Sequence, residues 1–205
     1  VNDCFLKKQS DIKNYLRSVC FSSGDTNIIK GEPNYRRLWL DKVVTQLEPV
    51  YLDLLSRFNK LLKQRSHFWS TNISQNDEKN SLVDSFDYQL ATIGTRILRR
   101  RNRALEKLKP YIQYWHNYLS KSKEKITLSY NSTIEITDDN EEKIVSNLLN
   151  KLFIQRGIEA LSGRCSVGPH RDDIEFLIND ISIRKFGSAG QQRTITLALK
   201  MAELE

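Results

Sequence analysis

Residues 186–203 read FGSAGQQRTITLALKMAE, in which an apolar strand is expected to end at Phe186 and a helix to begin at about Ala189. Gly187 and Gly190 let backbone or ligand approach closely, because no Cβ stands in the way. The free amides at a helix start and the helix dipole together form an anion site, and Ser188 adds a hydroxyl donor. The segment therefore predicts a phosphate-binding turn, with an ordinary glycine-containing helix cap as the alternative.

The rest of a nucleotide site is missing from the sequence. No G-x-x-x-x-G-K-[ST] loop occurs anywhere in the chain, and no apolar strand ends in paired acids suited to Mg²⁺. The turn is thus interpreted as a phosphate sensor without a nucleotide of its own. No catalytic residue is assigned within this chain.

Short strands are predicted before this segment, by alternation of apolar and polar residues, at 126–130, 164–168, 174–178 and 181–186. Asn179–Asp180 suits a tight hairpin turn, because both residues tolerate positive φ. A helix is expected to begin after Asp138 and Asp139, whose carboxylates favour the positive end of its dipole, and to end at about Arg156.

Two long helices are predicted in the first 120 residues, with a short helical stretch at 11–17 before them. From Pro33 the apolar residues recur at spacings of four and three: Leu40, Val44, Leu47, Tyr51, Leu54, Phe58 and Leu61. Pro49 lies inside this pattern and should kink or break the helix. After a polar loop, Ser70 to Asn80, a second pattern runs through Phe86, Leu90, Ile93, Ile97, Ala104, Tyr111, Trp115 and Tyr118. Such a pair most simply forms an antiparallel helical arm.

Composition excludes several classes of protein. The 205 residues include 39% hydrophobic residues and carry a formal charge of +7, with no apolar run of membrane-spanning length and no secretory signal in the first residues. We therefore expect a cytoplasmic protein without membrane contact. Metal-ligand spacing is absent from the cysteines and histidines, so no metal site is predicted: Cys4, Cys20, Cys165, His67, His116 and His170.

Basic residues crowd one predicted helix and share a face: Arg96, Arg99, Arg100, Arg103 and Lys107. They are candidates for contacts to DNA phosphates, with a solvated helix surface as the alternative. Weaker candidates on the first long helix are Arg36, Arg37, Lys42, Lys60, Lys63 and Arg65. The aromatic residues Tyr111, Tyr114, Trp115 and Tyr118 could stack on bases or pack in a core.

Four motifs in order resemble the RecF family, bacterial recombinational-repair ATPases of the ABC/SMC-like group. They are IKGEPNYRRLWLD at 29–41, FDYQLATIG at 86–94, GPHRDD at 168–173 and FGSAGQQRT with LALKMAE at the end of the chain. The chain departs from the family pattern at 21–26, where FSSGDT stands for FSPEDL, and at Ala189, where the family has Gln.

The resemblance implies a mainly helical α+β fold, in which a long antiparallel helical arm is inserted into a partial ABC-type ATPase head with short strands. The head is expected to supply residues 1–32 and 158–205, and the arm residues 33–157. The resemblance also implies an internal fragment, whose missing N-terminal phosphate loop and C-terminal acidic strand would hold most of ATP and Mg²⁺.

The resemblance further implies roles for the turn. ATP is sandwiched between two heads, so Ser188 and Gly190 would contact the γ-phosphate held by the other subunit. Gln191 and Gln192 would orient the turn or bridge the interface, and Arg193 would pair at a surface or touch phosphate.

The resemblance also implies a RecF-like function. We expect ATP-dependent homodimerisation on single-stranded or gapped DNA, with RecO- and RecR-type partners, recombinase loading and the SOS response. The full-length protein would be a slow ATPase and this chain alone inactive. The alternative is a non-enzymatic DNA- or protein-interaction arm of another SMC-like ATPase.

GPHRDD contains His170, Arg171, Asp172 and Asp173. A histidine beside carboxylates can perform acid–base chemistry. Adjacent residues of an extended segment point to opposite sides, however. A structural or interface polar network that fixes the arm to the head is the other interpretation.

Overall fold

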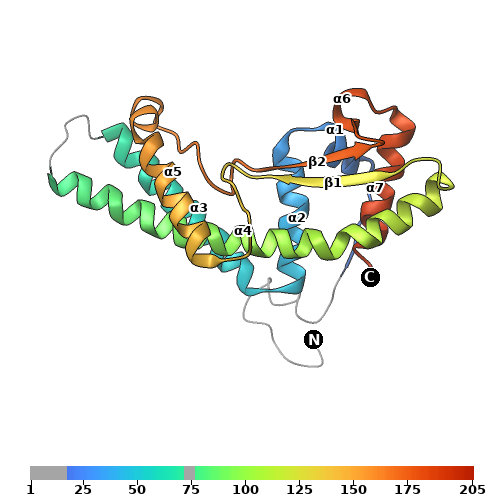
Figure 1. Ribbon diagram of the computed structural model, residues 1–205, viewed down its shortest axis with the longest axis horizontal. Helices are drawn as coiled ribbons and strands as arrows, with labels where there is room; N and C mark the ends of the chain where they lie inside the picture. Colours follow the sequence, from blue (N-terminus) through green and yellow to red (C-terminus); the bar gives the residue numbers. More distant parts are fainter. Residues whose placement is uncertain (1–17, 72–76) are drawn as a thin grey trace. The chain divides into compact units, whose positions relative to one another are not determined.

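The computed structural model describes residues 18–71 and 77–205 (Figure 1). These residues form two compact units. Unit 1 contains the described residues 18–49, 101–131 and 173–205, and unit 2 contains 50–71, 77–100 and 132–172. Residues 33–49 and 101–131 lie in unit 1, and the assignment of 1–32 and 158–205 to a head and of 33–157 to an arm stays a prediction.

Unit 1 combines a small antiparallel sheet with helices. Its strands, in sheet order, are β1 (Ile126–Asn131), β2 (Asp173–Ile178) and β3 (Ile181–Ser182). Its helices are the 3₁₀ helix η2 (Ser23–Thr26), α1 (Asn27–Lys30), α2 (Pro33–Leu47), the later part of α4 (Asp77–Ser120), α6 (Ile183–Phe186) and α7 (Ala189–Ala202).

Strand alternation explains the core of unit 1. In β2 the residues Ile174, Phe176 and Ile178 are buried while those between them are partly exposed. The register places Ile178 opposite Ile126 of β1, which is also buried. The ring of Trp39, from α2, lies 6.2 Å from that of Phe176. One apolar sheet face therefore packs against α2, as period-two patterning requires.

One predicted strand, 164–168, is wrong and another, 181–186, is too long, whereas the turn between the last two strands is right. Asn179 and Asp180 both have positive φ, 47° and 64°, and join β2 to β3 as predicted. β3, however, ends at Ser182, and residues 183–186 form the helical turn α6. Residues 164–168 form no strand either, because side chains rather than a neighbouring strand satisfy their backbone.

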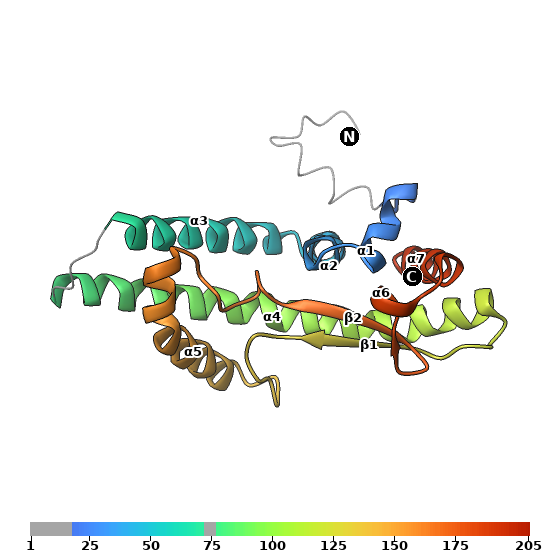
Figure 2. The ribbon, with the colours of Figure 1, turned by 90° about the horizontal axis from the view of Figure 1, so that it is seen from above.

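Unit 2 is a helical hairpin covered by a third helix. α3 (Val50–Thr71) and the first part of α4 run antiparallel (Figure 2), and the rings of Phe68 and Phe86 lie 6.4 Å apart. The predicted break at Pro49 is confirmed, since α2 ends at Leu47 and α3 begins at Val50. The loop is shorter than 70–80, because α3 reaches Thr71 and α4 begins at Asp77.

α5 (Glu141–Ser162) completes unit 2. Asn140 caps it by accepting a hydrogen bond from the Lys143 amide at 3.1 Å, and Gly163 ends it with φ 65°. The helix thus continues past Arg156, the predicted end. The mainly helical α+β fold is confirmed; the predicted helix at 11–17 and the central residues of the predicted loop, 72–76, lie outside the described residues.

Candidate functional site

The turn between α6 and α7 is built by a close backbone approach. The Gly187 amide donates to the Ile183 carbonyl at 2.9 Å. A Cβ at position 187 would lie 2.6 Å from that carbonyl oxygen and 2.5 Å from a methyl group of the same residue. Only glycine fits there, so the close approach inferred from the sequence exists within the chain itself.

Ser188 is the N-cap of α7 and forms a capping box with Gln191. The Ser188 Oγ accepts from the Gln191 amide at 3.2 Å, and the Ser188 amide donates to Gln191 Oε1 at 2.8 Å. A hydroxyl carries one donor and two acceptor positions. Capping uses an acceptor position, so the hydroxyl hydrogen of Ser188 is available to an anion.

The next two amides complete an exposed group of donors. The amides of Ala189 and Gly190 lie in the first turn of α7, ahead of the first intrahelical bond, which runs from the Gln192 amide to the Ser188 carbonyl at 3.0 Å. Among the described residues neither amide has an acceptor. Both residues are exposed. Two amides and one hydroxyl therefore face solvent at the positive end of a helix, the arrangement that binds phosphate oxygens.

Gly190 differs from Gly187 in its surroundings. A Cβ at position 190 would approach nothing closer than Ser188 Oγ, at 3.8 Å. The fold of this chain does not require a glycine there. The missing side chain leaves room outside the turn, as a ligand that approaches the backbone needs.

The remaining residues of the turn, Gln191, Gln192 and Arg193, differ in their hydrogen bonds to the rest of the chain. Gln192 Nε2 donates to the Gly187 carbonyl at 3.2 Å. Arg193 is exposed and makes no hydrogen bond or ion pair within the described chain. Gln191 Nε2 donates to Glu124 Oε1 at 2.7 Å. Sequence reasoning missed Glu124, which precedes β1 and is 67 residues from Gln191 in the chain.

The GPHRDD residues do not form one site. His170 Nε2 and Arg171 Nε share the Cys165 carbonyl, at 3.0 and 2.9 Å. Asp172 is buried and accepts from the Thr133 amide at 2.9 Å, within unit 2. Asp173 pairs with the buried Arg36 of unit 1, with 2.6 Å between Arg36 Nε and Asp173 Oδ1. Each of these residues hydrogen-bonds to backbone or forms an ion pair inside a single unit, and a polar network that fixes the arm to the head stays a prediction.

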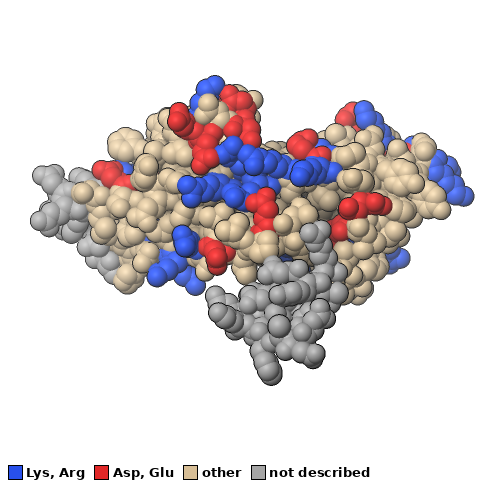
Figure 3. All heavy atoms as spheres, turned by 90° about the horizontal axis from the view of Figure 1, so that it is seen from below, with Lys and Arg blue, Asp and Glu red and all other residues tan. Residues whose placement is uncertain are grey.

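The basic helix carries acidic neighbours. In unit 2, Arg99 pairs with Asp139 and Glu141, and the hydrogen bond with Asp139 raises the pKa of Arg99. Arg96 lies 3.6 Å from Glu141. Figure 3 likewise shows acidic side chains among basic ones on the face that it draws. Part of the predicted positive charge is therefore neutralised.

Three other basic residues of the candidate DNA-binding face, Arg100, Arg103 and Lys107, are exposed or partly exposed. Arg100 is partly exposed and donates to the Arg96 carbonyl at 3.2 Å, also within unit 2. Arg103 is exposed, and Lys107 is exposed and makes no hydrogen bond or ion pair within the described residues. Tyr111, Tyr114 and Tyr118 are exposed as well, so they are not core residues.

Two of the weaker DNA candidates are wrong, because both guanidinium groups are buried in ion pairs. Arg36 donates to both Asp173 oxygens and to the Gly31 carbonyl, the last at 2.8 Å. Arg65 pairs with Asp87 at 2.9 Å and with Glu159. A buried cation that is already paired cannot reach a phosphate.

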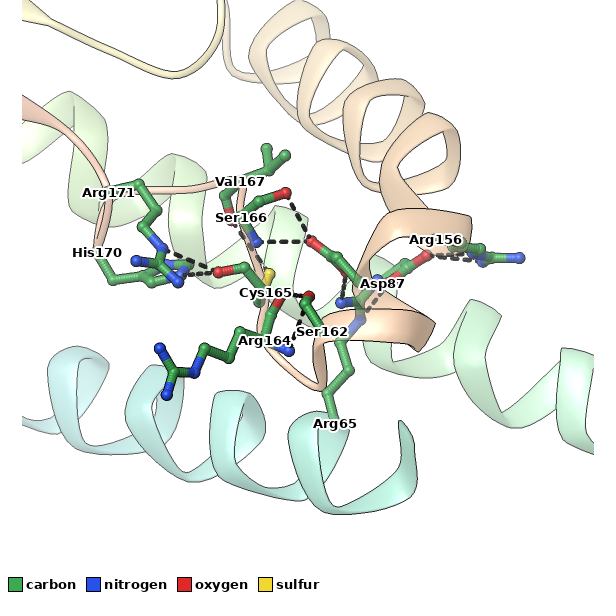
Figure 4. Close-up of polar contacts among 11 residues, drawn as sticks. Arg65, Asp87, Arg156, Ser162, Arg164, Cys165, Ser166, Val167, His170 and Arg171 are labelled. Carbon is green, nitrogen blue, oxygen red and sulfur yellow. Dashed lines mark hydrogen bonds and ion pairs between the residues drawn. The ribbon is translucent and has the colours of Figure 1, made fainter. Parts of the chain in front are cut away.

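Arg65 lies in a cluster of polar contacts in unit 2 (Figure 4). Arg156 donates from Nε to Asp87 Oδ2 at 2.8 Å, so Asp87 lies between two arginines. Glu159 Oε1 accepts from the Ser166 amide at 2.7 Å. Burial lowers the pKa of Arg65, but Asp87 and Glu159 outweigh it and raise that pKa. The cluster joins α3, α4, α5 and the loop after α5.

Several other kinds of site find no support among residues 18–71 and 77–205. No group of three His, Cys, Asp or Glu residues there could hold a metal ion. None of their helices has the length and apolarity to cross a membrane. Burial raises the pKa of the Cys165 thiol to about 12, so Cys165 is protonated and poorly nucleophilic at neutral pH. Cys20 is exposed, and Cys4 lies outside the described residues.

The chain is similar to known proteins along its whole length. It is 45% identical over 205 residues to the DNA replication and repair protein RecF of Synechococcus sp. (strain CC9605), covering 100% of this chain and 56% of that protein. It is 44% identical over 204 residues to the protein of the same name from Thermosynechococcus vestitus, covering 100% and 54%. No protein-family model matches.

Solved structures of RecF proteins are similar to this chain as well. A structure described as the recombination mediator protein RecF-ATPrS in the RecFOR pathway superposes with a TM-score of 0.90 and 32% identity, covering 97% of this chain and 53% of that one. The corresponding RecF-ATP structure gives a TM-score of 0.88 and 33% identity, with the same coverage. The chain thus spans about half the length of the relatives that it matches.

Proposed function

We propose, from the similarity of the whole chain to RecF, that it is part of a DNA replication and repair protein of that kind and presents its α7 turn to ATP bound by a second subunit. The carrying observation is the group of exposed, unused donors at Ser188, Ala189 and Gly190. These donors fit the oxygens of a terminal phosphate. The chain has no phosphate loop for the rest of the nucleotide.

ATP would then act as the switch for dimerisation. Contacts from the turn to the γ-phosphate exist only when two subunits meet, so ATP shifts the population toward the dimer. Hydrolysis removes the γ-phosphate and with it these contacts. Arg193, exposed beside the turn, adds positive charge where the phosphates arrive. Mg²⁺ and the β-phosphate would be held by parts of the protein other than this chain.

Ser188→Arg tests the proposal. We expect it to lower ATP-dependent self-association of the full-length protein at least a hundredfold, because it removes the hydroxyl donor and fills the space in front of the free amides. Sedimentation velocity with and without ATP measures the association. Fluorescence titration with an ATP analogue should show unchanged nucleotide binding by each subunit.

Ser146→Arg is the matched control. Ser146 is exposed on α5, so this substitution adds the same charge and bulk away from the turn. It should associate as the unchanged protein does. Association of Ser188→Arg at the same level as this control would overturn the proposal.

We also propose that the basic part of α4 contacts DNA backbone phosphates, with Arg103 and Lys107 as its main residues. Both are exposed, and Lys107 makes no hydrogen bond or ion pair within the described residues. Arg99 is paired with Asp139 and Glu141. Such contacts are independent of sequence and sensitive to salt, which suits the recognition of single-stranded or gapped DNA. RecO- and RecR-type partners, recombinase loading and a link to the SOS response belong to this proposal through the similarity to RecF.

Lys107→Glu is expected to weaken DNA binding about fivefold to tenfold at low salt. Loss of one phosphate contact should also reduce the slope of log affinity against log salt by about 0.9 for duplex DNA and about 0.7 for a single strand. Fluorescence anisotropy over a salt series measures both quantities.

Lys151→Glu makes the same charge change on the exposed face of α5 and serves as the control. Adding Arg103→Glu to Lys107→Glu should about double the loss of slope. Equal affinities and slopes for Lys107→Glu and Lys151→Glu would contradict the role assigned to α4.

A further inference from the structure

Glu124 connects the end of α4 to the candidate phosphate turn. It lies between α4 and β1, in unit 1, and its side chain is 25% exposed. Its Oε1 accepts a hydrogen bond from Gln191 Nε2 at 2.7 Å. Gln191 in turn caps Ser188 through its Oε1 and its own amide. Hydrogen bonds therefore run from the Glu124 carboxylate through the Gln191 side chain to the Ser188 backbone amide, and the Gln191 backbone amide bonds the Ser188 hydroxyl.

The carboxylate determines how the Gln191 amide is oriented. An ionised glutamate only accepts hydrogen bonds, so the NH₂ group of Gln191 must face Glu124. The carbonyl oxygen of Gln191 must then face the Ser188 amide, which needs an acceptor. The opposite orientation would place an NH₂ group against an N–H group and an oxygen against the carboxylate. Glu124 thus selects the orientation in which the capping box closes.

His116 lies near the second carboxylate oxygen of Glu124. It lies in the last turns of α4, is fully buried, and its Nε2 is 3.9 Å from Glu124 Oε2. Neither ring nitrogen has a hydrogen-bond partner among the described residues. Burial lowers the pKa of His116, an effect that Glu124 partly offsets. A neutral imidazole does not draw the carboxylate away from Gln191.

We propose that Glu124 is a positioning residue for the phosphate-binding turn: it holds Gln191 so that the capping box leaves the Ser188 hydroxyl hydrogen and the Ala189 and Gly190 amides directed at phosphate. The inference rests on the proposed function. It adds a residue outside the α7 turn to the γ-phosphate site. The residues between α4 and β1 thereby set the geometry of the turn.

Glu124→Ala should weaken ATP-dependent self-association of the full-length protein about tenfold, the size expected from losing one hydrogen bond to a charged group. Glu124→Gln should retain most of the association, because its amide oxygen still accepts from Gln191 Nε2. Sedimentation velocity measures both, with melting temperature and ATP-analogue binding measured in parallel. Neither of these two readouts should change, since the loop that binds each subunit's own nucleotide is not touched.

An exchange of the two side chains separates positioning from general support of the fold. Gln191→Glu alone places two carboxylates face to face and should weaken association as Glu124→Ala does. The double variant Glu124→Gln with Gln191→Glu restores a donor opposite an acceptor, and glutamate at the third helical position also forms a capping box. The double variant should therefore associate better than Gln191→Glu. Such non-additivity is the signature of a direct coupling.

The outcomes distinguish failure of this inference from failure of the proposed function. If Ser188→Arg blocks association but Glu124→Ala and Gln191→Glu associate normally, the inference fails and the proposed function stands. If Ser188→Arg itself associates normally, the proposed function fails. Loss of melting temperature or of ATP-analogue binding in Glu124→Ala that parallels the loss of association, or no recovery in the double variant, would also overturn the inference.

Discussion

Arg65→Ala is expected to lower the free energy of unfolding of unit 2 by about 3–5 kcal/mol, the cost of removing one partner from a buried ion pair. The Arg65 side chain is fully buried, as is that of Glu159, and Asp87 is 3% exposed. Asp87 keeps Arg156 as a charged partner in the variant, but the groups that Glu159 keeps, Ser166 and the protonated Cys165, are neutral. The unpaired Glu159 carboxylate therefore accounts for most of the expected loss.

Urea titration gives the free energy, and hydrogen exchange in α5 and the loop after it shows that the loss lies in unit 2. Arg57→Ala is the matched control, because Arg57 is exposed on the same helix, and it should change stability by less than about 0.5 kcal/mol. Arg65→Met combined with Glu159→Gln should recover at least half of the loss, since no buried charge is then left without a partner. No recovery would contradict this account.

Arg36→Ala is expected to lower the free energy of unfolding of unit 1 by about 2–4 kcal/mol. Arg36 is 2% exposed and its guanidinium donates to both oxygens of Asp173 and to the carbonyls of Ile28 and Gly31. Asp173 is 29% exposed and can be partly solvated in the variant, so we expect a smaller loss than for Arg65.

Arg36→Lys should recover little, because lysine cannot form the two-pronged contact with a carboxylate. Lys42→Ala, at an exposed position of the same helix, provides the control. Thermal unfolding, together with hydrogen exchange across β1 and β2, distinguishes these variants. A loss of less than 1 kcal/mol in Arg36→Ala would show that the pair is dispensable.

Features with a local physical cause were predictable from the sequence. Pro49 breaks the helical pattern because it lacks an amide donor, whatever the rest of the fold. Asn179–Asp180 turns the chain because both residues tolerate positive φ, and Ser188 begins a helix because its hydroxyl caps it. The helical hairpin followed in the same way from two apolar periodicities and a polar loop between them.

Features that depend on distant partners were not predictable. Arg36 and Asp173 are 137 residues apart, and Arg65 and Glu159 are 94 apart, so neither pair is visible in a local pattern. For that reason Arg36 and Arg65 were placed among surface candidates. Residues 183–186 form a helical turn rather than a strand because the Gly187 amide closes on the Ile183 carbonyl.

In the candidate site, too, the residues that are adjacent in sequence were predictable and the distant partners were not. Ser188, Gly190 and Gln191 were predicted as a group because they are adjacent in sequence and lie at the start of one helix. Glu124 was not, because it meets Gln191 only after the end of α4 and the start of α7 come together in unit 1. On α4, helical spacing placed the arginines on one face but could not reveal Asp139 and Glu141 beside Arg99.

The contrast between the two glycines of the turn has a consequence for variation among natural and engineered sequences. Position 187 is restricted by its own backbone, so a saturation library sorted for abundance in cells should retain glycine alone there. Position 190 has open space around it, and alanine at the start of a helix is no obstacle to folding. Under the proposed function, the same library placed in the full-length protein and sorted for survival of DNA damage should lose alanine at 190. A glycine that only the second selection preserves identifies a surface shaped for another molecule.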